Sequence, residues 1–167
     1  MLKDMEIPKR YSEYLKMKPE DFDQSPKGWR MLEKEKGSLE AIDLIIKYIS
    51  SNEKDINDCG HNTKEFLNFH IGQLYAMSGE KYFKKSIGFF KKSYIKNQEC
   101  WNTYVDATIG FLNMDKKIVE RSIDCIKKSK ENNKQSGNLP ILNNFLREID
   151  DGRNNYYAAY NMKRVDV

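Results

Sequence analysis

The sequence predicts an all-α protein, and three observations support this fold class. Apolar residues recur at helical spacing, as in Phe83, Ile87, Phe90 and Tyr94. No segment keeps the alternation of apolar and polar residues that is typical of a strand. Only a few residues separate most of the candidate helices, which favours antiparallel neighbours. We therefore expect seven to eight helices in antiparallel hairpins, stacked as a short α-α superhelix.

Residues with cap and turn preferences set the expected helix bounds in the first third of the chain. Ile7, Tyr11 and Leu15 share one face of a short first helix. Ser25 and Pro26 have the residue types favoured at an N-cap and in a first turn, so a hairpin should occupy residues 26–51. Its two helices should meet at residues 37–38, with Gly37 ending the first and Ser38 capping the second. Residues 51–61 are polar and predict a connector.

The remaining expected helices are assigned in the same way. Asn62 and Glu65 have the spacing of a capping box before a long apolar run. Asp115 should cap another helix. The composition of residues 130–138 is typical of a loop. We expect two capping helices within residues 139–162.

An internal repeat links two of these helices. Residues 86–93 (SIGFFKKS) and 122–129 (SIDCIKKS) lie 36 positions apart and are identical at five of eight positions. Residues 41–48 (AIDLIIKY) are a weaker earlier copy. Ala41, Ser86 and Ser122 are the small residues of these copies, and each would let a neighbouring helix approach closely.

With these landmarks the chain resembles a tetratricopeptide repeat protein. Gly72 and Tyr75 match landmarks of the first helix of that family's unit, and Ser86, Phe90 and Ser93 match those of the second. The linker between Gly79 and Ser86 is about two residues longer than the family pattern, and the closing Pro is missing. The resemblance implies a single helical domain over 1–167, with its best repeats at about 62–97 and 98–130. The alternative is an ordinary helical bundle in which the octapeptide match is accidental.

The resemblance also implies a binding site, because first helices of this family line a groove that holds partner segments. In that register the groove would present apolar anchors beside amide and carboxylate groups, namely Phe69, Gln73, Met77, Asn102 and Asp106. For Phe69 the alternative is burial in the core.

Charge gives a second candidate surface. The formal net charge is +4, and only six of the 29 basic residues are Arg, so we do not expect a dedicated nucleic-acid binder. Lys84, Lys85, Lys91, Lys92 and Lys96 lie opposite the apolar stripe that begins at Phe83. They predict a solvated helix face, with a patch for an acidic partner as the alternative.

Recognisable catalytic chemistry is not found in the sequence. It contains neither a phosphate-binding Gly-rich loop nor a G-x-S-x-G elbow. Cys59, His61 and His70 match no standard metal spacing, so we expect no metal and no cofactor. An active site that involves His70 or Cys100 remains the enzyme alternative.

Together these observations predict a protein that is not an enzyme and that binds another protein. A bacterial immunity protein that neutralises a toxin is one version, suggested by the short chain and its 23 Lys and 15 Asn residues; an adaptor is another. The alternative outside this class is a helical repeat that binds RNA through Lys-rich helices. Three widely spaced cysteines and an N-terminus without an apolar segment predict a cytoplasmic setting. No apolar run is long enough to predict a membrane span. Neither the partner nor the oligomeric state is predicted.

Overall fold

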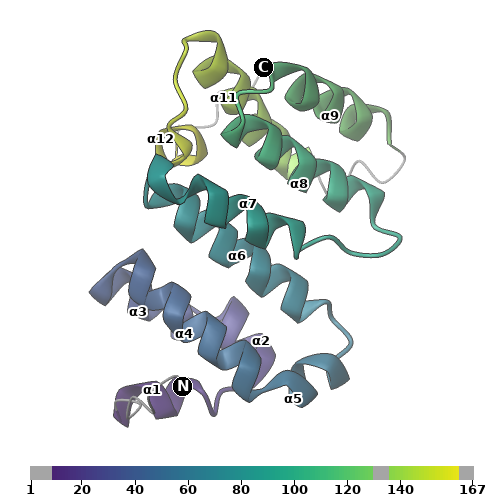
Figure 1. The fold of residues 1–167 in the computed structure, drawn as a ribbon. Coiled ribbons are helices and arrows are strands. Elements are labelled where there is room, and N and C mark those ends of the chain that lie inside the picture. The colour runs from purple at the N-terminus through teal and green to yellow at the C-terminus, as the bar shows by residue number, and fades with distance from the viewer. Residues whose placement is uncertain (1–8, 130–135, 162–167) are drawn as a thin grey trace. The chain divides into compact units, whose positions relative to one another are not determined.

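The computed structural model describes residues 9–129 and 136–161, and this part of the chain is helical without any strand (Figure 1). The all-α prediction is therefore confirmed. Three predictions fall outside the described residues. They are the position of Ile7, the end of the second repeat at 130 and the end of the capping helices at 162. The chain divides between Leu67 and Asn68 into two compact units, called unit 1 and unit 2 below. The single domain and the superhelix stay predictions.

Unit 1 consists of short helices around one longer hairpin. Its helices are α1 (Lys9–Tyr14), α2 (Pro19–Gln24), α3 (Trp29–Lys36), α4 (Ser38–Ser51) and α5 (Glu53–Asp58), followed by the beginning of α6 (Thr63–Met77). Helices α3 and α4 pack together, as the expected hairpin requires. The expected number of helices, seven to eight, fits only the longer ones of the described residues, because α1, α2, α5 and α12 (Tyr156–Asn161) have six residues each.

The core of unit 1 is built on α4, whose buried side chains include Ala41, Ile42 and Ile45. The Tyr48 ring stacks on Phe22 of α2 with 3.6 Å between the ring centroids. The Tyr48 hydroxyl donates a hydrogen bond of 2.7 Å to the Met17 carbonyl, so the polar end of this buried ring is satisfied.

Three local predictions in unit 1 are corrected. Helix α3 begins at Trp29 rather than at Pro26, because Ser25 accepts a bond from the Lys27 N–H within a separate turn. Gly37, at φ 96°, is the N-cap of α4, and Ser38 is its first residue. The polar stretch at 51–61 is partly helical, because α5 places Ile56 in the core.

Unit 2 contains the residues from which the repeat was inferred. After α6 come η1 (Glu80–Tyr82), α7 (Phe83–Lys91), α8 (Glu99–Leu112), α9 (Lys116–Lys128), η2 (Ser136–Asn138), α11 (Leu139–Asp150) and α12 (Tyr156–Asn161). Aromatic side chains dominate the core: Phe69, Phe90, Tyr104, Phe111, Phe145 and Tyr156 are all buried. The extra linker residues after Gly79 form the 3-10 turn η1.

Helices α6 and α7 pack closely and antiparallel (Figure 1). The buried Ser86 hydroxyl donates a 2.7 Å hydrogen bond to the Gly72 carbonyl. A Cβ at Gly72 would lie 2.8 Å from the Phe90 ring, so only glycine fits this approach. One turn earlier on α6, the Phe69 ring centroid is 5.0 Å from that of Phe90. Small residues thus bring the two helices together, as the repeat predicts.

Helices α8 and α9 form the next hairpin. The Asp115 side chain accepts a 3.2 Å bond from the Ile118 N–H, which confirms the predicted cap of α9. A Cβ at Gly110 would lie 2.8 Å from Ile118, so this hairpin is closest near its turn. Ser122 is buried, like Ser86. Their structural equivalence stays a prediction.

Candidate protein-binding surfaces

The five predicted partner-binding residues all lie in unit 2, but Phe69 and Gln73 are buried. Phe69 is 4% exposed, and its ring packs on Phe90, Trp101 and Tyr104 at centroid distances of 5.0, 4.9 and 5.6 Å. The exposure expected of Phe69 is therefore wrong. This contact does bring the two expected first helices, α6 and α8, together. Trp101 and Tyr104, three residues apart, share one helix face in the sequence, and this spacing is the pattern that indicates an aromatic partner for Phe69.

Gln73 is 7% exposed, so its expected exposure is also wrong. Its Oε1 lies 3.0 Å from His70 Nδ1. It also lies near the hydroxyl of Tyr156, whose pKa is raised by burial and lowered to a smaller extent by Gln73. Tyr156 begins α12, which therefore lies against the face of α6 that was expected to receive a partner.

Asn102 and Asp106 hold the loop that precedes α8. The Asn102 side chain accepts from the Ile95 N–H and donates to the Ile95 carbonyl, both at 2.9 Å. Asp106 accepts a hydrogen bond from the Tyr94 hydroxyl. Asp106 itself remains exposed, and Met77 is half-buried against the core. Met77 and Asp106 thus keep the accessibility that partner binding needs, while the polar atoms of Asn102 are already used.

A second surface lies on the side of α7 that points away from Ser86 and Phe90. Lysine side chains here extend over aromatic rings that are half-buried at the helix flank. The ammonium groups lie 5.0 Å (Lys81 to Tyr82), 5.6 Å (Lys85 to Tyr75) and 4.6 Å (Lys92 to Phe89) from the ring centroids. We call these six residues the Lys–aromatic face. The sequence showed the lysines but not that aromatic rings lie beneath them.

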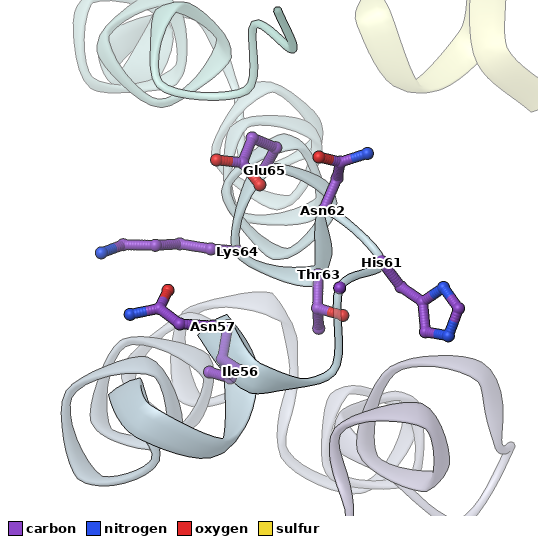
Figure 2. A pocket seen from close by; sticks show the side chains of 8 residues that line it. Ile56, Asn57, His61, Asn62, Thr63, Lys64 and Glu65 are labelled. Atoms are coloured by element: carbon purple, nitrogen blue, oxygen red, sulfur yellow. The ribbon is translucent and has the colours of Figure 1, made fainter.

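An open polar pocket lies in unit 1, between α5 and α6 (Figure 2). It has a volume of about 220 Å³ and is lined by Ile56, Asn57 and residues 60–65. The His61 imidazole points away from Asn57 and Lys64 (Figure 2), and its Nε2 lies 3.6 Å from Glu20 Oε1. Cys59 faces the Thr63 hydroxyl at 3.2 Å. Cys59 and His61 therefore do not face each other across the pocket, and the pocket does not form a joint Cys–His site.

The residues of the metal and enzyme alternatives are held by other groups. Within residues 9–129 and 136–161, no cluster of three or more His, Cys, Asp or Glu side chains is placed to hold a metal ion. The Cys100 thiol donates to the Ser129 hydroxyl at 3.0 Å, and His70 pairs with Gln73. The enzyme alternative stays an untested hypothesis.

Comparison with known proteins found no match to a family model, to a curated protein or to a solved structure. The resemblance to tetratricopeptide repeats therefore rests on the residues themselves. In the described part of the chain, none of the helices has the length and apolar character to cross a membrane.

Proposed function

We propose that the chain is a non-enzymatic module that binds another protein through unit 2. The observation that carries this proposal is the row of exposed lysines along η1 and α7 and at the C-cap of α7. Lys81, Lys84, Lys85, Lys91 and Lys92 are exposed and take part in none of the ion pairs among the described residues. A surface of one charge sign on a rigid element attracts partners of the opposite sign.

The helix packing supports a rigid platform for such binding. Helix α7 is fixed to α6 through Gly72, Ser86 and Phe90, so its outer lysines are presented by a close-packed hairpin. Residues built on a rigid helix lose less freedom on association than residues of a mobile loop. The tetratricopeptide-like register of this hairpin agrees with a binding role, although a fold alone does not define a function.

The RNA-binding alternative needs the lysines of α7 and α9 to form one positive face. Lys116, at the start of α9, is instead paired with Asp150 at 2.6 Å and with Glu120 at 3.7 Å. These carboxylates offset its charge. Lys116 would therefore contribute little to such a face, and Lys117, Lys127 and Lys128 are the exposed lysines that α9 retains.

Two cellular roles fit this binding activity. One is neutralisation of a toxin by a cytoplasmic bacterial immunity protein, in which the module would cover the toxin's working surface. The other is an adaptor that links two proteins. Both roles require that the chain form a stable complex with another protein.

The proposal is tested by crosslinking the full chain to its partners in the native cell, with and without nuclease treatment. We expect a nuclease-resistant protein adduct that weakens in the Lys84→Ala/Lys91→Ala variant. The matched comparison is Met77→Ala/Asp106→Ala, on the predicted groove, with folding of both variants checked by circular dichroism. Loss of the adduct on nuclease treatment would contradict protein binding. Protection of cells against a toxin encoded beside the gene would assign the immunity role.

A further inference from the structure

The Lys–aromatic face combines a positive charge with ordered apolar surface. The Tyr75 ring lies between Tyr82 and Phe89, with centroid distances of 5.8 and 5.7 Å. Lys85 is shared between two of these rings, at 5.6 Å from Tyr75 and 6.0 Å from Tyr82. Each ammonium group is attracted by the negative face of a ring, while the lysine stem covers apolar carbon. Each of these lysines therefore has a favourable position over a ring.

The local charge is strongly one-sided. Residues 80–96 contain six Lys and a single acidic residue, Glu80. The carboxylate of Asp106 also lies near this segment, because it accepts from the Tyr94 hydroxyl after the end of α7. A partner with several carboxylates would therefore find donors here that carry no internal salt bridge.

The ring geometry distinguishes between two kinds of polyanion. Single-stranded nucleic acid gains affinity when its bases stack on open aromatic faces. Here the rings lie against one another, and lysines lie over Tyr75, Tyr82 and Phe89. Residues 68–120 also contain no Arg, whose planar group suits phosphate better than lysine does. Carboxylates need only the point charges that lysine offers.

We propose that the Lys–aromatic face binds an acidic polypeptide segment in which pairs of carboxylates are separated by single apolar side chains. The carboxylates would pair with Lys81, Lys85 and Lys92, and the apolar side chains would contact the ring edges between them. Lys85 and Lys92 lie two helical turns apart, roughly 10 Å along α7, which is about three residues of an extended segment. This inference rests on the proposed function and specifies its partner.

The test uses the full chain and three synthetic probes: a peptide of Glu-Glu-Leu repeats, its Gln-Gln-Leu counterpart and an oligothymidylate of the same charge as the first. Binding is followed by fluorescence anisotropy at low and at physiological salt. The variant Lys81→Gln/Lys85→Gln/Lys92→Gln removes three charges from the face. The matched control, Lys117→Gln/Lys127→Gln/Lys128→Gln, removes three exposed charges from α9.

We expect the Glu-Glu-Leu peptide to bind and the Gln-Gln-Leu peptide not to bind. The face variant should weaken binding about tenfold or more, and the α9 control by less than about twofold. Equal loss in the two variants would overturn this inference but leave a protein-binding module with another surface. Absence of peptide binding to the wild-type chain would also overturn it. Tight oligothymidylate binding without peptide binding would overturn both this inference and the proposed function.

Discussion

At the residue scale, Gly72 and Gly88 lie inside the two helices of one hairpin, yet a methyl group has opposite consequences at the two positions. At Gly72 the added Cβ would lie 2.8 Å from the Phe90 ring, which is fully buried and cannot move aside. At Gly88 no atom lies within 4 Å of the added Cβ. The same change therefore tests packing at one site and helix propensity at the other.

We expect Gly72→Ala to destabilise the protein by about 1–3 kcal/mol through overpacking, which exceeds its gain in helix propensity. Gly88→Ala should stabilise it by up to about 1 kcal/mol, because alanine loses less backbone entropy in a helix. Urea unfolding measures both free energies. Equal effects of the two substitutions would show that α6 and α7 are not in close contact at Gly72.

Ser86 gives a second test of the same contact. Ser86→Leu should cost about 1–3 kcal/mol, because the side chain is fully buried against α6. Ser86→Ala removes only the hydrogen bond to the Gly72 carbonyl and should cost about 0.5–1.5 kcal/mol. A Leu variant as stable as the wild type in urea would place this position in solvent.

At the element scale, the segment between α7 and α8 is fixed by side chains of α8. Trp101 Nε1 donates to the Ser93 carbonyl at 2.8 Å, and Asn102 makes two bonds with the Ile95 backbone. Backbone groups that lie outside a helix and are hidden from water need such partners. The Asn102 side chain thus hydrogen-bonds both the N–H and the carbonyl of one loop residue, Ile95.

We predict that Asn102→Ala lowers stability by about 1–3 kcal/mol, since it leaves the Ile95 N–H without its bond and removes one of the two bonds to the Ile95 carbonyl, which also accepts from the Gln98 N–H. The Ile95 amide should exchange with solvent faster, which hydrogen exchange measures residue by residue. Asp106→Ala is the control, because it removes only a bond at the exposed Tyr94 side chain. A larger loss of stability in the control would show that the loop is held from the Tyr94 end.

Element boundaries were predicted best where one local rule dominates. The Asp115 cap of α9 follows from side-chain chemistry alone, and it is observed. Helix α5 was missed because its helix exists through the burial of a single apolar residue, Ile56, in a polar stretch. Helix α3 starts late because Ser25 and Pro26 form a turn of their own. Tertiary packing, which the local pattern does not contain, decided the case of α5, and a competing local turn decided that of α3.

At the scale of the whole molecule, buried tyrosines link stability to alkaline pH. Burial raises the pKa of Tyr104 and Tyr156, and burial together with the hydrogen bond to Glu40 raises that of Tyr11 to about 12. In the unfolded chain these phenols ionise near pH 10. The unfolded state therefore loses protons first, and the stability due to these groups is lost as pH rises above about 10.

We expect the urea midpoint to stay level below about pH 10 and to fall steadily above it. The part of the tyrosinate absorbance that comes from Tyr104 and Tyr156 should appear together with unfolding, because these buried phenols cannot ionise in the folded state. In the Tyr11→Phe variant the urea midpoint should fall less above pH 10, since this variant lacks the phenol that donates to Glu40. A midpoint independent of pH up to 12 would contradict these raised pKa values.

The all-α architecture followed from apolar periodicity, whereas the predicted groove followed from a register that assigns faces without knowing what covers them. Phe69 was placed on the groove, but Trp101 and Tyr104 cover it. Gln73 was also placed there, but Tyr156, more than eighty positions later in the sequence, lies beside it. A helical period shows which residues share a face, but long-range contacts determine which face remains open.

The two sides of the α6–α7 hairpin also differ in how freely they can evolve. On the inner side, Gly72, Ser86 and Phe90 constrain one another, so a change in one requires a change in the others. On the outer side, the ammonium groups of Lys81, Lys85 and Lys92 lie over aromatic rings, and these side chains are exposed. Single substitutions at these exposed positions should therefore leave the fold intact. A lineage that must keep pace with a changing partner would accumulate its differences on this face.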